Sequence, residues 1–167
     1  MNLVNDNDSK VIVNIIATVF PKITIYENDV PQDFDRPCFL IIRPDKNTTT
    51  REITRTVYEE TKLFTVYAFD ELPDEVKSNV DMISQEMEST KHALIDYIMG
   101  VPKHLIPDTD RRYITVELVN VESDDVNAVS EFTLRTKRML SRDLRKPKVN
   151  KIMEVVNNGM VIATGKE

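Results

Sequence analysis

Hydrophobic residues recur with the period of an α-helix in two stretches of the chain. The first stripe covers residues 11–19 and ends at Pro21, a residue that a helix interior does not tolerate. The second helix is expected to start at residues 72–75, where a proline and two acids favour a first turn. Its apolar face continues over residues 76–98, and Gly100 then provides a C-terminal cap. The pattern predicts one short helix and a second helix of about seven turns.

Alternating or β-branched segments fill most of the remaining chain. The residues Cys38–Ile42 are all apolar, which is typical of a central strand buried on both faces. Glu59 and Glu60 are expected to form the turn of a two-stranded ribbon, which projects beyond the core because neither face of its first strand is consistently apolar. The segments that predict the other strands are 22–26, 51–58, 63–69, 113–121 and 129–138.

The order of these elements predicts the fold class. Most strands are neighbours in sequence, so they are expected to form a mainly antiparallel sheet covered on one face by the two helices. The predicted class is α+β, with a protruding β-ribbon and a C-terminal hairpin arm. Residues 1–142 are expected to form one α+β domain, and residues 143–167 a linker and a hairpin with Asn-Asn-Gly at its turn. This hairpin is a candidate for addition to a neighbour's sheet.

Charge and composition exclude several classes of protein. The 167 residues carry a net charge of −6 and have a pI of about 5.1, which argues against broad, nonspecific binding of nucleic acid. The single cysteine, Cys38, excludes an internal disulfide and fits a reducing compartment. No apolar run reaches the roughly 18–20 residues that span a bilayer, and the N-terminus lacks a signal-peptide pattern. We therefore expect a protein that is made and used in a cytoplasm, without a membrane partner.

A search for catalytic or metal-binding residues finds none in a suitable pattern. His92 and His104 have no partner at metal-ligand spacing and are interpreted as surface or boundary residues. Cys38 is expected to be a buried small hydrophobe with a raised pKa. Asp124 and Asp125 are interpreted as turn residues rather than as a cation site. The sequence therefore predicts no enzyme, no catalytic residue, no cofactor and no metal.

Two features indicate that the chain works by contact. Phe34 lies in a stiff loop between Pro31 and Pro37, where it is either an anchor for another subunit or a lid over its own core. A basic run between residues 135 and 148 is either a solvated face or a patch for an acidic partner or for DNA in a channel. The candidate interface residues are Phe34, Arg36, Arg51, Arg55, Arg145 and Lys146.

The chain resembles the tail terminator proteins of tailed bacteriophages and of phage-like particles of Gram-positive hosts. The likeness covers the layout of residues 8–140. It is carried by Tyr26, Val30-Pro31-Gln32, Phe34, Arg36-Pro37-Cys38-Phe39, Arg55-Thr56, the strand Phe64–Phe69 and the long helix after it.

The resemblance implies a non-enzymatic subunit of a hexameric ring. Such a ring caps the tail tube, ends its polymerisation and offers a docking surface to the head connector or a head-closure protein, while double-stranded DNA passes through its lumen without specific binding. It implies assembly in the host cytoplasm and a final place at the neck end of the virion tail. The alternatives are a tail tube or head-closure protein and, from another class, a small cytoplasmic enzyme or ligand-binding domain with a pocket under the Pro31–Pro37 loop.

Overall fold

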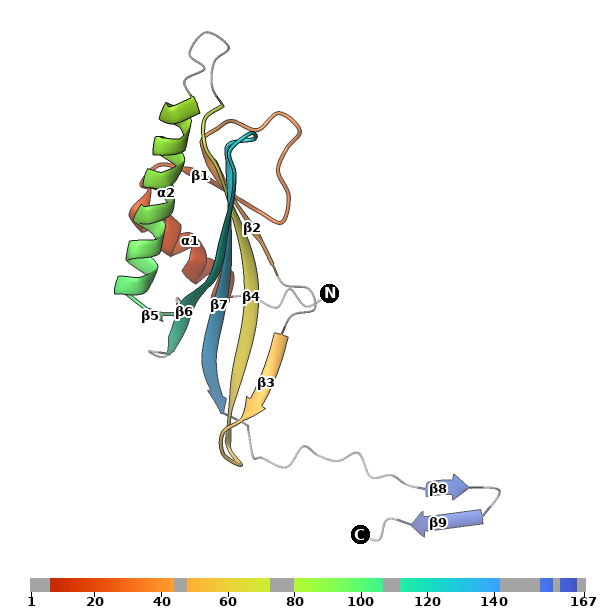
Figure 1. Cartoon of the computed structure of the whole chain (residues 1–167). Helices are drawn as coiled ribbons and strands as arrows, with labels where there is room; N and C mark the ends of the chain where they lie inside the picture. Colours follow the sequence, from red (N-terminus) through yellow and green to blue (C-terminus); the bar gives the residue numbers. More distant parts are fainter. Residues whose placement is uncertain are drawn as a thin grey trace.

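Two helices lie on one face of a twisted sheet in the computed structural model (Figure 1). Helix α1 spans Asn7–Val19 and helix α2 spans Val80–Gly100. The element order and the helical layer confirm the α+β class with two helices on one face of the sheet. The structure describes residues 7–43, 48–72, 80–106, 112–141, 154–157 and 160–164.

The main sheet has the strand order β1-β2-β4-β7-β6-β5, and β3 also pairs with β4. Strands β1 and β2 are parallel and the other described pairs are antiparallel, so the predicted mainly antiparallel sheet is confirmed, while the parallel pair was not predicted. Two further strands, β8 and β9, form a separate antiparallel pair and join no other described strand. The bounds are β1 Thr24–Glu27, β2 Cys38–Ile42, β3 Thr48–Glu52, β4 Val57–Phe69, β5 Lys103–Leu105, β6 Tyr113–Asp124, β7 Val129–Ser141, β8 Glu154–Asn157 and β9 Met160–Thr164.

Strand β4 is the long central element that gives the sheet two different ends. One edge pairs with β7 along its whole length, from Val57 opposite Ser141 to Phe69 opposite Val129. The other edge is shared, because β2 pairs with its last residues and β3 with its first. We call β2 with residues 64–69 and 129–134 the covered end, and β3 with residues 53–59 and 139–141 the projecting end. Figure 1 shows that the projecting end extends beyond both helices.

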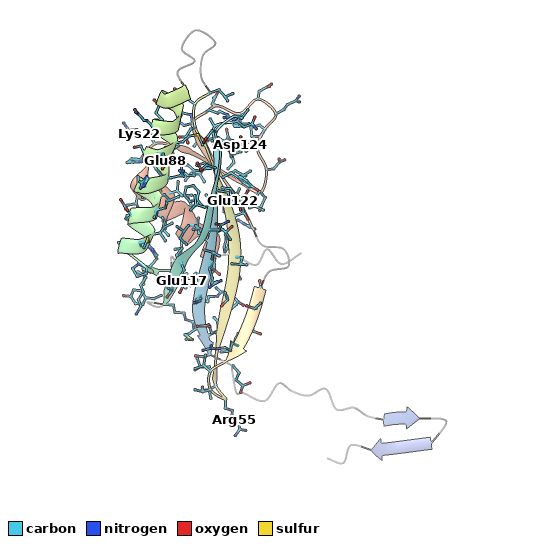
Figure 2. All side chains as sticks on the ribbon, viewed as in Figure 1. Lys22, Arg55, Glu88, Glu117, Glu122 and Asp124 are labelled. Atoms are coloured by element: carbon cyan, nitrogen blue, oxygen red, sulfur yellow. The ribbon has the colours of Figure 1, made fainter. Side chains whose placement is uncertain are left out.

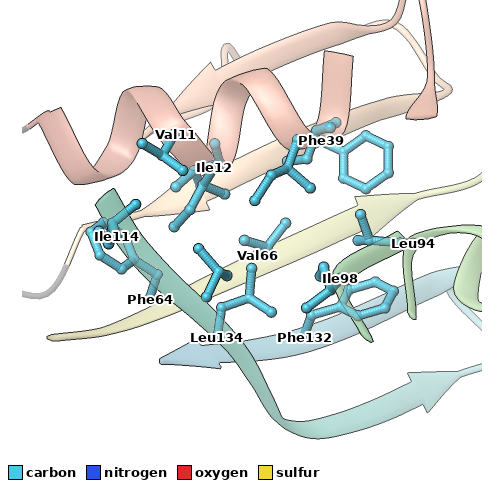
Figure 3. Packing of buried hydrophobic residues seen from close by; sticks show 14 of the residues in the cluster. Val11, Ile12, Phe39, Phe64, Val66, Leu94, Ile98, Ile114, Phe132 and Leu134 are labelled. Atoms are coloured by element: carbon cyan, nitrogen blue, oxygen red, sulfur yellow. The ribbon is translucent and has the colours of Figure 1, made fainter. Parts of the chain in front are cut away.

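Strand alternation places the hydrophobic core between the sheet and the helices. Phe64, Val66 and Ala68 of β4 are all buried on the helix side, and the stripe of α1 packs onto them. The predicted apolar faces of both helices are confirmed where the structure describes them. The predicted start of the second helix, at residues 73–75, lies outside the described residues. Figure 3 shows the cluster, including Val11, Ile12, Phe39, Phe64, Val66, Leu94, Ile98, Ile114, Phe132 and Leu134.

The predicted turn at Glu59–Glu60 is wrong. Both glutamates lie within β4, and the chain reverses at residues 53–56. There the Thr54 hydroxyl accepts a hydrogen bond from the Val57 backbone N–H at 3.1 Å, and the Val57 carbonyl accepts two more from residues 53 and 54. The glutamates fit a strand because each meets a partner on a neighbouring strand, which local sequence does not reveal.

A short strand that the sequence did not predict follows α2. Strand β5 pairs Lys103 with Thr115 and Leu105 with Tyr113, so His104 lies in a strand and not in a loop. Three residues give too short a pattern for sequence reasoning, and the strand depends on its pairing with β6. Strands β6 and β7 also extend three residues beyond their predicted ends, to Asp124 and Ser141.

Candidate interface surfaces

The loop between β1 and β2 is fastened to the face of the sheet that the helices leave open (Figure 1). The Phe34 ring meets the Phe69 ring edge-on at a centroid distance of 5.0 Å. The Arg36 guanidinium lies 5.5 Å from the Phe34 centroid and 5.3 Å from that of Phe69. It also donates to the carbonyl oxygens of Asp70, at 3.1 Å, and Asn127, at 2.8 Å. Phe34 therefore lies over its own chain, as the lid interpretation expects.

Beneath this loop the open face of the sheet is buried. Cys38 and Leu40 alternate with the core residues Phe39 and Ile41, yet Cys38 is fully buried. Burial raises the pKa of the Cys38 thiol, against the opposing effect of the Arg36 charge. The prediction of a buried cysteine with a raised pKa is confirmed. The Phe34 ring is packed on the sheet here rather than raised above a ligand pocket.

The projecting end carries the two predicted arginines. All residues of β3 are exposed, and Arg51 lies opposite Glu59 of β4. Arg55 is exposed in the turn at the tip, where Figure 2 shows its side chain pointing away from the sheet. The other two predicted basic residues, Arg145 and Lys146, lie outside the described residues.

Between the projecting end and the β5–β6 edge, the open face has two adjoining hollows of about 580 Å³ each. Both are lined by Glu59 and Lys137. The Lys137 ammonium pairs with the Glu117 carboxylate at 2.9 Å, and Arg135 approaches the same carboxylate at 3.7 Å. Among the described lining residues, cations outnumber acids: the charged ones are Arg51, Lys103, Arg135, Lys137, Arg138, Glu59 and Glu117.

Arg138 belongs to the same strand but reaches the helix side. Its Nη1 donates to Oδ1 of Asp8 at 3.1 Å, and its Nε donates to Oε1 of Glu60 at 2.9 Å. Lys62 adds a second cation 3.3 Å from the Asp8 carboxylate, whose side chain is 1% exposed. This network fastens the first turn of α1 to the sheet. The basic run predicted from sequence is thus divided between the two faces, and its part beyond residue 141 lies outside the described residues.

The end of the sheet at the β6–β7 turn is acidic. Asp124 accepts hydrogen bonds from the Val126 backbone N–H at 3.0 Å and from the Asn127 side-chain amide at 2.6 Å. The bonds from Asn127 are the main cause of the lowered pKa of Asp124. Strand β6 ends at Asp124 and the turn covers residues 125–128, so the turn interpretation is confirmed for Asp125, while Asp124 is the last strand residue and accepts hydrogen bonds from the turn. Glu122 and Glu131 lie opposite each other just below this turn, so charge differs along the sheet from acidic to basic (Figure 2).

An exposed apolar patch lies where α2 ends beside β5 and β6, and sequence reasoning missed it. We define the edge patch as Met99, Val101, Leu105 and Tyr113; Met99 is 72% and Tyr113 62% exposed. A hollow of about 290 Å³ adjoins it, lined by residues that include Ile98 and Met99. Met99 falls one position beyond the buried stripe that ends at Ile98 and therefore faces solvent. This offset from the stripe is the feature of the sequence that could have indicated an exposed Met99.

Neither histidine lies in a group that suits catalysis. The His92 side chain is 67% exposed, and its Nδ1 lies 2.7 Å from the Glu88 carbonyl oxygen. His104 is half-buried beside the Tyr97 ring, and burial lowers its pKa. In the part of the chain that the structure describes, no group of three or more His, Cys, Asp or Glu residues is arranged to hold a metal ion. No helix in that part has the length and apolar content to cross a bilayer.

A family model for phage tail terminator proteins matches residues 9–98. The chain belongs to the phage tail terminator family. The match runs from α1 through the Phe34 loop and the projecting end to the last turns of α2, so it includes four of the six predicted interface residues. No curated protein matches the chain. Membership makes this chain a structural component of a phage tail, and the resemblance noted from its sequence is confirmed at the level of the family.

Proposed function

We propose that this chain is the subunit of a hexameric ring that caps the tail tube, ends its polymerisation and then presents a surface to the head connector or a head-closure protein. The family match over residues 9–98 carries this proposal. The ring assembles in the host cytoplasm and stays at the neck end of the tail. The Tyr26–Phe69 resemblance adds a Gram-positive type of host to the proposal.

A closed ring requires two different surfaces on each subunit that mate head to tail. The edge patch is suited to one of them. Covering large exposed apolar side chains such as Met99 and Tyr113 with a neighbouring subunit removes them from water, which favours association. Its counterpart lies across the sheet, where β1 forms the opposite edge beside the Phe34 loop. In this arrangement Phe34 shapes the contact surface and Arg36 holds the loop in place.

The contact along the axis of the ring is assigned to the projecting end. The projecting end presents Arg51 and Arg55 to the tail tube protein, because its side chains are exposed and no helix covers it. Arg145 and Lys146, which lie outside the described residues, are proposed for the same contact from the sequence alone. The net charge of −6 favours a lumen through which double-stranded DNA slides without tight phosphate contacts.

The test combines the mass of the particle with an effect on tube growth. Light scattering and negative-stain images of the purified chain should show rings with close to six times the subunit mass of 19.3 kDa. When the chain is added to polymerising tail tube protein, tubes should become shorter and carry a ring at one end.

Other results would point to the alternatives. Long tubes formed by this chain alone would identify a tube protein. Binding to the connector with no effect on tube length would identify a head-closure protein. A monomer that leaves tube growth unchanged and binds no connector would overturn the proposal and reopen the enzyme or ligand-binding alternative.

A further inference from the structure

Strand β3 is an edge strand with an uninterrupted ladder on one side. Its register with β4 runs from Thr48 opposite Lys62 to Glu52 opposite Tyr58 without a bulge, and among the described residues β4 is the only strand that it pairs with. Such an edge is a template for another strand. It contains no proline or charged cluster that would prevent pairing; its sequence is Thr-Thr-Thr-Arg-Glu.

The other edges of the sheet are less suited to strand addition. Strand β6 is interrupted by a bulge between Leu118 and Asn120, a feature that bends the strand and disrupts regular pairing. Strand β1 has four residues and is followed directly by Asn28, whose φ of 65° ends the extended conformation. Strand β5 has only three residues. Among the described edge strands, β3 is thus the longest that no bulge interrupts; residues 120–124, beyond the bulge of β6, form a regular stretch of the same length.

Strands β8 and β9 form a two-stranded sheet that pairs with no other described strand. A sheet of two strands is at best marginally stable in water unless a third strand or another surface supports it. The sequences Glu-Val-Val-Asn and Met-Val-Ile-Ala-Thr are rich in β-branched residues, which favour strands. Strand β9 has five residues, the same length as β3.

We propose that β9 of one copy of this chain adds as a strand to the outer edge of β3 in a neighbouring copy. The added strand would satisfy the main-chain groups of both edges and extend the sheet across the boundary between subunits. This proposal rests on the proposed function, in which copies of the chain assemble. It gives the C-terminal segment, which the family match does not reach, the task of linking subunits.

The position of β7 favours a neighbour over the same chain. Strands β3 and β7 pair with opposite edges of β4, so a segment leaving Ser141 must pass the 53–56 turn to reach its own β3. That segment, residues 142–153, carries five basic residues and one acid, and the turn exposes Arg55. Like charges oppose this path. Residues 142–153 can span roughly 40 Å when extended, which is enough to reach another subunit.

Two variants of the full chain, each with one added cysteine, test the contact. Thr50→Cys marks the centre of β3 and Ile162→Cys the centre of β9, and the only native thiol, Cys38, is buried. The two variants are co-assembled and oxidised, and the products are separated on a non-reducing gel. We expect a disulfide-linked dimer from the mixture and little from either variant alone, because only a contact between copies joins the two residues.

A matched control pairs Ile162→Cys with Lys22→Cys, an exposed residue outside β3. Rings that form normally but yield no more Thr50–Ile162 dimer than this control would overturn the strand-addition proposal and leave the proposed function intact. A variant that carries both Thr50→Cys and Ile162→Cys and forms the disulfide only within one chain would also overturn the strand-addition proposal. Absence of rings and of tube capping in the unmodified protein would instead contradict the proposed function as well.

Discussion

The covered end and the projecting end are built on the same two strands but depend on different interactions. At the covered end, β4 and β7 carry Phe64 and Phe132, both fully buried beneath the helices, while the Phe34 loop covers part of the opposite face. At the projecting end, the exposed Arg51 lies opposite the half-buried Glu59. The same ladder of main-chain bonds is thus supported by hydrophobic burial at one end and is flanked mainly by polar side chains at the other.

This difference separates the residues that stabilise the fold from the residues that contact other proteins. Hydrophobic burial supplies most of the free energy of folding, so the covered end determines whether the domain folds. The projecting end has little side chain to bury and contributes mainly surface. Substitutions should therefore change folding at one end and assembly at the other, and each prediction below tests that separation.

The largest loss of stability is expected from Phe64→Ala. The ring is fully buried within the core cluster, and truncation of such a ring costs about 3–5 kcal/mol because a cavity remains. Denaturant unfolding of the variant measures the loss. Thr61→Ala, three residues away and only half-buried, is the control and should cost less than about 0.5 kcal/mol. Equal losses would contradict the comparison.

The boundary between the two ends is tested by Arg138→Met. Removal of the guanidinium takes one of its cations from the buried Asp8 carboxylate, so a loss of about 2–3 kcal/mol is expected. The matched control is Arg135→Met on the open face of the same strand, whose partner Glu117 is exposed to solvent. That exposed pair should be worth at most about 0.5 kcal/mol. A similar loss in both variants would show that α1 is not fastened by this network.

The covered end could be largely predicted from sequence, because its strands and helices are held by buried hydrophobic residues. Cys38–Ile42 was assigned with its observed bounds because a strand buried on both faces leaves a continuous apolar run. The stripe of α1 and the last turns of α2 were visible for a similar reason. Burial leaves a periodic signature in the sequence, so reasoning from periodicity succeeds where burial dominates.

The projecting end and the contacts of the loop could not be predicted in the same way. Glu59 and Glu60 were placed in a turn because their partners lie on other strands. Arg36 was selected as an interface residue, but its acceptors at Asp70 and Asn127 are 34 and 91 residues away. Such contacts depend on tertiary structure and leave no local pattern.

Phe34→Ala tests whether the loop belongs to the covered end. Loss of the edge-on contact with Phe69 and of the cation–π contact with Arg36 should cost about 1–2 kcal/mol. The monomer should stay folded, while ring formation weakens because the contact surface loses its shape. Light scattering over a dilution series measures the assembly. Phe34→Leu keeps apolar contact and should assemble better than the alanine variant; unchanged assembly of Phe34→Ala would count against the loop as an interface.

Asp70→Asn should change stability by less than Phe34→Ala does, and its effect should depend on pH. Burial raises the pKa of Asp70, so its ionisation is less favourable in the folded chain, and stability falls as pH rises from the unfolded value of 3.8 through the folded value. Asparagine should remove that decline and still accept the Thr90 hydroxyl hydrogen bond, which measures 2.9 Å. Unfolding free energies between pH 3 and pH 7 test this. Asp124, whose pKa is lowered, should show the opposite sign when replaced by asparagine.

The smallest effect on folding is expected from charge reversal at the tip, Arg55→Glu. The side chain is exposed in the 53–56 turn beyond the helices, so stability should change by less than about 0.5 kcal/mol. Tube capping should nevertheless weaken, and more so at low salt, because a cation that meets an acidic tube surface acts over a Debye length of about 10 Å at 0.1 M salt. Lys22→Glu is an equal change of charge at the other end of the sheet and should leave capping unchanged. If both reversals weakened capping alike, net charge rather than the projecting end would govern the contact; if Arg55→Glu unfolded the domain, the tip would belong to the folding core and the two ends would not be separable.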